Sequence, residues 1–273
     1  MIKTILFFMI IFSFKCYSSG IQQIKDILVK DKLIKEEDKN KIDELKRKVE
    51  QDNLNFTKEN QINKADFLNL VANLWLVKRE KILKWDFKKV DYGVNEVFQN
   101  LLKKFSTSGL NYKILYLNSD AVVHYGLSMG DSYLLLISKP FIERLDLSKQ
   151  EIALILFEEY IRLNSNIVEE KLMSHIGDFQ VSNLNPIIDK TLLFYDDYIL
   201  NKGFTFQDQY ELVKSVAINI KNDKKVVELY RGLNDKIKNL IILDKSFHGY
   251  SKRFPSPDLK EKWLENLIPV EKL

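Results

Sequence analysis

The sequence predicts an α+β protein that is mainly helical and contains one small sheet of about three strands. Three observations lead to this fold class. Apolar residues recur at helical spacing along most of the chain, while glycine and proline are few (9 and 5 of 273 residues). Between residues 112 and 138 the pattern changes to short runs of β-branched and aromatic residues. An apolar content of 45% and a charged content of 29% are typical of a globular chain.

The N-terminus has the features of a signal peptide. Lys3 supplies a positive charge, and the eleven residues 4–14 are mostly apolar. This run is too short to span a bilayer as a helix, which takes about 20 residues, but it has the length of a signal-peptide core. Small residues suited to cleavage follow at Ser18, Ser19 and Gly20. We therefore expect residues 1–19 to act as a leader and the protein to be exported.

Cys16 follows the apolar run directly, and this arrangement resembles a bacterial lipoprotein box. The resemblance implies that Cys16 becomes an acylated N-terminus that anchors the protein to a membrane. Lys15 departs from the pattern, which has a small residue before the cysteine. The alternative is cleavage near Gly20, which releases a soluble periplasmic product. Because Cys16 is the only cysteine, the folded part is expected to have neither a disulfide nor a cysteine-based metal site.

The charge balance argues against a nucleic-acid partner. The chain has 42 Lys and Arg against 38 Asp and Glu, and two of those lysines, Lys3 and Lys15, lie in the leader. A nucleic-acid binding protein needs a basic face, and the remaining balance is close to neutral. The expected partners are instead another exported or membrane protein, and the membrane itself through the leader or a lipid anchor.

After the leader, we expect a charged helical extension and then the main domain. Residues 20–58 are rich in Lys, Glu and Asp, with apolar residues at helical spacing in 21–28 and 42–49. This extension is interpreted as a membrane spacer, a cap on the domain or a solvated helix without a partner. The main domain, residues 59–273, begins with helices predicted at 60–84 and 92–106.

The predicted strands are residues 112–116, 121–124 and 133–138, with a turn around Gly126 and Gly130. A short helix is expected at 141–145. The helix at 148–163 has the clearest pattern, because Ser148 and Glu151 have the spacing of a capping box and an interior that is apolar nearly all round marks a buried helix. Further helices are expected at 166–175, 187–201, 206–221, 224–243 and 258–268.

Residues 92–164 resemble the core of the HtpX- and BepA-type zinc metallopeptidases (metallopeptidase family 48). The resemblance rests on Asp120-Ala121, the turn around Gly126 to Gly130, the strand 133–138 and the lead-in at 147–156, which fall in the family's order. It covers about a quarter of the chain. It implies a three-stranded sheet packed on a buried helix that is equivalent to the peptidase active-site helix.

The family's His-Glu-x-x-His motif should follow this lead-in, and here the stretch reads Phe157-Glu158-Glu159-Tyr160-Ile161. Two histidines four residues apart lie on one helix face and can hold one zinc ion. Phe157 and Ile161 have no lone pair to offer a metal, so these two metal positions are degenerate. Only Glu158 remains, at the position of the family's general base. We therefore expect buried apolar side chains at Phe157 and Ile161, no metal or other cofactor, and no zinc peptidase activity.

Other candidates for chemistry are few. His124, His175 and His248 each have one acidic neighbour three or four residues away (Asp120, Asp178 and Asp244), and each is interpreted as a surface or satisfied histidine. A rearranged site of Glu158, Glu159 and His175 is a further hypothesis. The acidic pairs Glu158-Glu159, Glu169-Glu170 and Asp196-Asp197 are interpreted as solvated helix faces. The sequence contains neither a phosphate-binding glycine loop nor a Gly-x-Ser-x-Gly motif.

The favoured function is therefore that of an exported bacterial envelope protein that binds or scaffolds another protein and has lost peptidase chemistry. An extended peptide could add to an edge of its sheet. Two alternatives stay open: a structural or surface lipoprotein unrelated to peptidases, and a hydrolase with a rearranged site.

Overall fold

The computed structural model describes residues 63–84, 92–105, 111–119, 123–176 and 184–268, and the single positions Glu44, Arg47 and Gln51. The predicted leader with Cys16, almost all of the charged extension, and Asp120 and Asp178 lie outside the described residues. The three single positions are helical and exposed. All the elements named below belong to one unit, Val49–Leu273.

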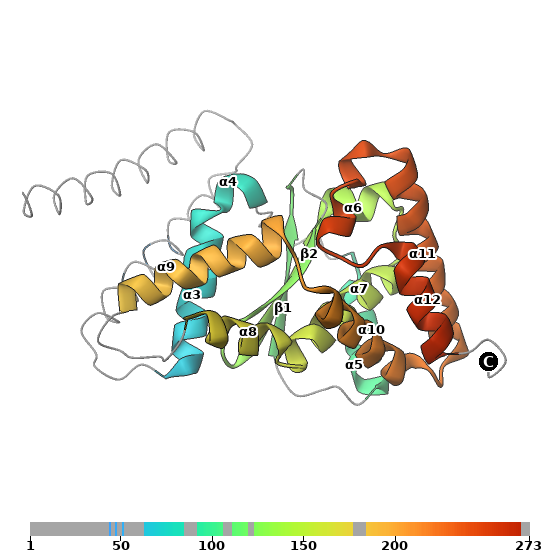
Figure 1. Ribbon diagram of the computed structural model, residues 1–273, viewed down its shortest axis with the longest axis horizontal. Helices are drawn as coiled ribbons and strands as arrows, with labels where there is room; N and C mark the ends of the chain where they lie inside the picture. Colours follow the sequence, from blue (N-terminus) through green and yellow to red (C-terminus); the bar gives the residue numbers. More distant parts are fainter. Residues whose placement is uncertain are drawn as a thin grey trace, which may run out of the picture. The chain divides into compact units, whose positions relative to one another are not determined.

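A three-stranded mixed sheet runs through the middle of this unit (Figure 1), in the order β1-β3-β2. Its strands are β1 (Asn111–Leu117), β2 (His124–Ser128) and β3 (Ser132–Ser138). β1 runs parallel to β3, with Asn111 opposite Ser132, and β2 runs antiparallel to β3, with His124 opposite Ile137. The prediction of a mainly helical α+β protein with a small three-stranded sheet is confirmed.

The second strand, predicted at 121–124, shares only His124 with the observed strand, and residues 121 and 122 lie outside the described residues. β2 begins at His124, and Gly126 lies inside the strand and not in a turn. The glycine is required there because a helix, α7 (Lys149–Asn164), approaches the strand closely. A Cβ atom at Gly126 would lie 2.6 Å from Leu163 Cδ1 of that helix. The turn-like residue is thus a packing residue.

The helices correspond closely to the predicted ones. Between residues 63 and 148 the described helices are α3 (Lys64–Lys78), α4 (Glu80–Leu83), α5 (Val94–Lys104) and α6 (Lys139–Arg144). After α7 come α8 (Ile167–Ile176), α9 (Leu184–Tyr195), a π-helix η2 (Asp196–Asn201), α10 (Phe206–Ile220), α11 (Lys224–Leu243) and α12 (Pro257–Leu267). None of the described helices is both long and apolar enough to cross a membrane.

Helix α7 lies at the centre of the packing. It contacts β2 and β3 of the sheet, and α5, α8, α10 and α11 surround it. Every residue from Glu151 to Leu163 is buried. Fully burying one leucine or phenylalanine side chain contributes about 2 kcal/mol, so this helix is a principal source of the unit's stability. A buried helix at 148–163 is therefore confirmed.

The chain returns to the core after α11, the longest of the described helices. Two short 3-10 helices, η3 (Lys245–Phe247) and η4 (Tyr250–Lys252), follow α11, and α12 then packs on α10 and α11. Phe247, Tyr250 and Phe254 in this region are buried. Phe141 of α6 stacks on Tyr250 with a ring distance of 6.0 Å and an interplanar angle of 7°. The region between α11 and α12 thus forms part of the core.

Candidate functional site: a buried polar cluster on helix α7

The start of α7 is set by a capping box. Ser148 Oγ accepts a hydrogen bond from the Glu151 backbone N–H at 3.3 Å, and the Glu151 carboxylate accepts one from the Ser148 N–H at 2.7 Å. Lys236 of α11 adds an ion pair to Glu151 at 2.8 Å. These contacts satisfy N–H groups that a helix start leaves without partners, and they connect α7 to α11. The capping box predicted from the sequence is confirmed.

Phe157 and Ile161 lie inside the core, 0% and 5% exposed. The Phe157 ring packs against Phe105 with a centroid distance of 5.4 Å. Residues four apart share one face of a helix, so these two side chains form an apolar stripe on α7. The expectation of buried apolar side chains at both positions is confirmed.

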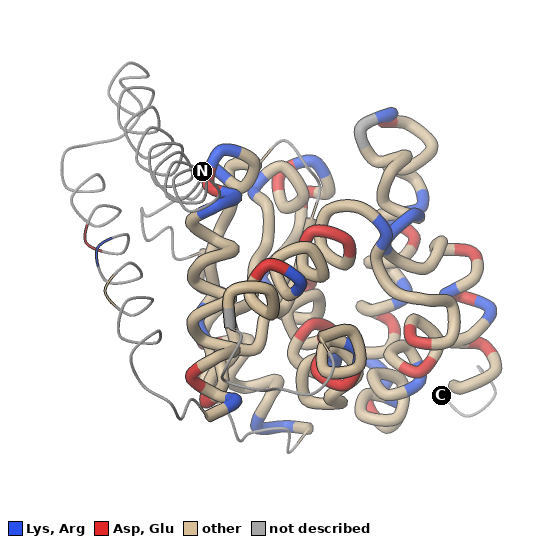
Figure 2. Tube along the Cα trace, turned by 60° about the vertical axis from the view of Figure 1, so that its left-hand side comes forward, with Lys and Arg blue, Asp and Glu red and all other residues tan. Residues whose placement is uncertain are grey.

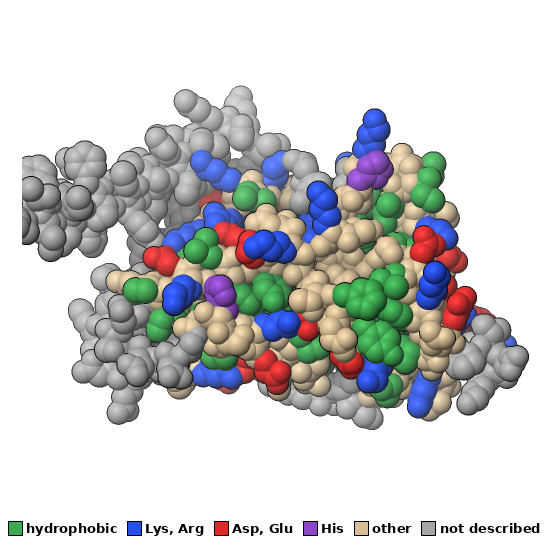
Figure 3. All heavy atoms as spheres, viewed as in Figure 1, with side chains coloured by type: hydrophobic (Ala, Val, Ile, Leu, Met, Phe, Trp, Pro, Cys, Tyr) green, Lys and Arg blue, Asp and Glu red, His purple; other side chains and the backbone are tan. Residues whose placement is uncertain are grey.

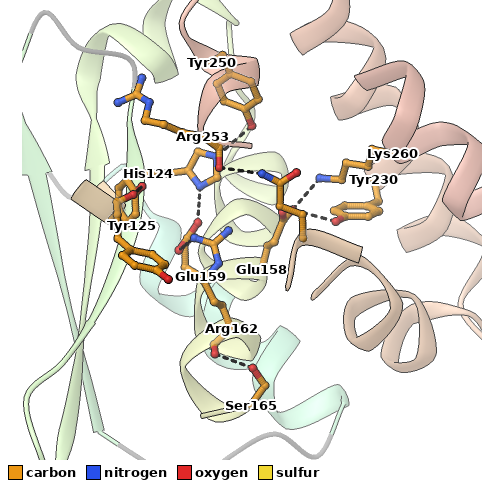
Figure 4. Close-up of polar contacts among 12 residues, drawn as sticks. His124, Tyr125, Glu158, Glu159, Arg162, Ser165, Tyr230, Tyr250, Arg253 and Lys260 are labelled. Carbon is orange, nitrogen blue, oxygen red and sulfur yellow. Dashed lines mark hydrogen bonds and ion pairs between the residues drawn. The ribbon is translucent and has the colours of Figure 1, made fainter. Parts of the chain in front are cut away.

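Glu158 is buried against two donors from the C-terminal helices (Figure 4). Lys260 Nζ of α12 and Tyr230 OH of α11 each donate to Glu158 Oε2 at 2.8 Å. The same ammonium group lies 4.4 Å from the centroid of the Tyr230 ring. One carboxylate therefore ties α7 to both α11 and α12.

The electrostatics keep Glu158 ionised. Burial by itself raises the pKa of a carboxyl group. Here the charge of Lys260, followed by His124, the hydrogen bond from Lys260 and the charge of Arg162, outweigh burial and lower the pKa of Glu158 to about 2. Burial raises the pKa of Tyr230 well above 10, and the charge of Glu158 raises it further, so the phenol keeps the proton that it donates.

Glu159 is fully buried in a second set of contacts. Its Oε1 lies 2.6 Å from His124 Nδ1 of β2, and its Oε2 accepts a hydrogen bond from Arg162 Nη1 at 2.8 Å. The other ring nitrogen of His124 lies 3.1 Å from Tyr250 OH. A carboxylate needs a donor, so we assign a proton to His124 Nδ1, which donates it to Glu159. Burial raises the pKa of Tyr250 well above 10, which keeps that phenol protonated.

Aromatic rings close this second set. The Phe254 ring stacks on His124 at 4.1 Å, and Arg162 Cζ lies 4.5 Å from the Phe204 ring and 5.8 Å from the Phe254 ring. Gly203 makes this possible: its φ is +68°, and a Cβ atom there would lie 2.4 Å from the backbone of Arg253. The two chain segments can therefore approach and hold the guanidinium between two rings.

Together these side chains form what we call the α7 polar cluster: His124, Glu158, Glu159, Arg162, Tyr230, Tyr250 and Lys260. All seven are buried. Two carboxylates, Glu158 and Glu159, lie beside two cations, Arg162 and Lys260. Such an arrangement holds charges and protons in place away from solvent, which is the behaviour of a structural network and not of a site that admits a substrate.

The structure corrects two interpretations of the acidic residues. Glu158-Glu159 is not a solvated face, because α7 is buried on all sides. Asp196 is also partly buried and accepts hydrogen bonds from Trp75 Nε1 at 3.0 Å and Arg79 Nε at 2.6 Å, which link the π-helix η2 to α3.

The remaining acidic pairs lie nearer to solvent. Asp197 forms an exposed ion pair with Lys202 at 2.6 Å. Glu170 is exposed, and the partly exposed Glu169 pairs with Lys64. The interpretation as a solvated helix face therefore holds only for Glu169, Glu170 and Asp197.

The rearranged site of Glu158, Glu159 and His175 does not form. His175 is exposed on α8, with its ring 5.7 Å from Phe194, and the histidine bound to Glu159 is His124. His248 is exposed as well. Among the residues that the structure describes, no group of three or more His, Cys, Asp and Glu side chains is placed to hold a metal ion.

Sequence reasoning did not find Lys260, Tyr230 or Tyr250 as partners. They lie 102, 72 and 126 positions from the side chains that they bind. A local signal did exist in α7 itself. Two glutamates and Arg162 interrupt a helix that is otherwise apolar nearly all round, and such charges must find partners inside the protein.

No family model matches this chain, and the comparison with curated proteins finds no match.

Proposed function

We propose that this chain is an exported envelope protein that binds another protein through a degenerate metallopeptidase-like domain and carries out no peptidase chemistry. The observation that carries the proposal is the environment of Glu158. The sheet packed on a buried helix supports the metallopeptidase-like part of the proposal, because this is the arrangement that the sequence resemblance requires.

A general base in a zinc peptidase must present its carboxylate to a metal-bound water. Glu158 instead faces Lys260 and Tyr230 at 2.8 Å and is 4% exposed. The lysine supplies at this position the positive charge that a metal supplies in the family. Phe157 and Ile161 offer no lone pair to a metal. The loss of metal ligands and the pairing of Glu158 with Lys260 therefore both argue against zinc peptidase activity.

The loss of catalysis is tested by measuring the bound zinc and the cleavage of an unfolded protein. The purified full chain is incubated with zinc, dialysed and analysed by elemental mass spectrometry, and it is then mixed with a labelled unfolded protein. We expect less metal than protein and no cleavage, with Glu158→Gln indistinguishable from the unmodified chain. Stoichiometric zinc, or hydrolysis that disappears in Glu158→Gln while circular dichroism shows intact folding, would refute the proposal.

The binding surface that we propose is the edge of β1 that faces away from β3. At the other edge, beside α7, the protein's own residues fill the space, since Phe254 stacks on His124 and Tyr125 OH of β2 donates to the Tyr198 carbonyl at 2.5 Å. β1 pairs with β3 on one side, and no described strand pairs with its other side. Tyr112, Ile114 and Tyr116 are partly exposed along the strand. An extended segment of another protein can add to such an edge through backbone hydrogen bonds.

Two neighbouring proline variants test this surface and control each other. Successive N–H groups of a strand point to opposite edges, so one of Lys113→Pro and Ile114→Pro removes an outward N–H and the other disturbs the β1–β3 pairing. With a fluorescent unfolded polypeptide as ligand, we expect one variant to lose binding at a nearly unchanged Tm. If both variants bind as the unmodified chain does, β1 is not the binding edge.

Export and anchoring are tested on the protein made in a bacterial cell. We expect a mature product shorter than 273 residues. Acylation at Cys16 predicts palmitate incorporation that Cys16→Ser abolishes, whereas cleavage near Gly20 predicts a free N-terminus there and no label. A product that retains Met1 and stays inside the cell would refute export.

A further inference from the structure

The C-terminal end of helix α11 carries two exposed apolar side chains. Ile242 and Leu243, the last two residues of α11, are 69% and 82% exposed. The end of α11 and the turn after it project at one extremity of the Val49–Leu273 unit (Figures 1 and 2). Isolated surface leucines are common, whereas here two adjacent apolar side chains are exposed at a projecting point.

Fraying does not explain this exposure. The residues that follow are anchored in the core, where Phe247 is 0% and Tyr250 is 5% exposed. Phe247 stacks on Phe141 of α6 with a ring distance of 6.2 Å. The same short region therefore places some apolar side chains inside and holds Ile242 and Leu243 outside.

Two exposed lysines follow the apolar pair in the chain. Lys245 and Lys252 are exposed, and no described acidic residue forms an ion pair with either. Asp244 is the only acidic residue between 242 and 252, and Arg144 neutralises it at 3.1 Å. Figure 3 shows hydrophobic, basic and histidine side chains together at this end of the molecule. Within residues 242–252, two lysines therefore accompany one acidic residue.

We propose that this α11 tip, defined by Ile242, Leu243, Lys245 and Lys252, docks on an anionic lipid bilayer. Apolar side chains beside lysines are the composition of interfacial membrane contacts, in which the former enter the headgroup region and the latter face lipid phosphates. A second copy of the chain is a poorer occupant, because a symmetric contact would bring the lysines of both tips together. The proposal does not depend on the leader or on Cys16.

The decisive experiment places a reporter at the tip of the full chain. Total vesicle binding is not informative, because the leader can bind vesicles too. The fluorescence of Leu243→Trp, after subtraction of the unmodified chain's emission, reports on the tip alone. With vesicles of equal parts phosphatidylglycerol and phosphatidylcholine, we expect a blue shift and quenching by brominated lipid. Leu193→Trp, on a helix-surface leucine that is 64% exposed, is the matched control and should show neither.

Three results would overturn the proposal. The first is an unshifted Leu243→Trp signal although the chain sediments with the vesicles. The second is an equal response at both reporters. The third is a blue shift of Leu243→Trp that follows protein concentration without lipid, which would make the tip a self-association surface.

Charge-reversal variants test whether the lysines of the tip contribute to binding of the anionic bilayer. In the Leu243→Trp background, removing one lysine should weaken vesicle binding about fivefold, and Lys245→Glu with Lys252→Glu should weaken it more than tenfold. Lys224→Glu with Lys225→Glu makes the same charge change at the other end of α11 and should leave the reporter titration unchanged. Equal binding to phosphatidylcholine alone, or no effect of Lys245→Glu and Lys252→Glu, would show that anionic lipid is not the ligand.

Discussion

Two regions of this protein use the same ion-pair chemistry in opposite environments. In the α7 polar cluster, Glu158 and Lys260 meet at 2.8 Å with side chains 5% and 7% exposed. On the surface of α10, Glu211 and Lys214 meet at 3.3 Å with side chains 40% and 42% exposed. The surface pair can exchange its partner for water at little cost, whereas neither member of the buried pair has that alternative.

The comparison shows what the buried charges do. Retaining a buried ion pair is not in itself stabilising, because removing two charges from water is costly. Loss of one partner, however, leaves the other charge uncompensated in the core. The cluster therefore connects β2, α7, α11 and α12. Removing any one of its charged side chains is expected to lower the free energy of unfolding.

The largest effect is expected from Lys260→Met. This change leaves the Glu158 carboxylate buried without its cation, and the free energy of unfolding should fall by about 3–5 kcal/mol. Urea unfolding followed by circular dichroism measures the loss. The double variant Glu158→Gln with Lys260→Met should recover much of it, and a loss below about 1 kcal/mol in the single variant would show that the pair is not coupled.

A pH effect of similar size is expected from Glu158. Its pKa is about 2 in the folded protein against an ordinary 4.5, so the stabilisation is fully present above pH 4.5 and is lost as the pH falls towards 2. The difference corresponds to about 3 kcal/mol. Unfolding midpoints measured between pH 6 and pH 2 should fall less steeply in Glu158→Gln than in the unmodified chain. Glu211→Gln, on the surface, should keep the original dependence.

A smaller loss is expected from Gly126→Val. The added side chain would meet Leu163 of α7, and overpacking of this kind costs about 1–3 kcal/mol. Thermal unfolding measures the change. Gly232→Ala serves as the control, since a Cβ atom there has nothing within 4 Å and alanine favours the helix. Equal stability of Gly126→Val and the unmodified chain would mean that α7 can move away from β2.

The smallest effect is expected on the surface. Lys214→Met removes the pair with Glu211 and should change the free energy of unfolding by less than about 1 kcal/mol. A loss as large as that of Lys260→Met would remove the distinction between the two regions.

Much of the fold was predictable because its signals are local. The capping box at Ser148 and the apolar pattern of residues 148–163 predicted α7 and its burial, and periodicity predicted the later helices. Strand β2 shows where local signals fail. Gly126 has the composition of a turn, and only the approach of Leu163 explains why a glycine stands inside β2.

The sequence by itself determined the helical class, the small sheet and the absence of histidines at Phe157 and Ile161, since each follows from residue type or from spacing within one segment. Only the tertiary structure decided that Glu158 and Glu159 are buried and which groups bind them. Their partners come from β2, α11 and α12, up to 102 positions away in the chain. A charged residue in a helix can face water or another charge, and the physical reason for the choice is which elements cover it.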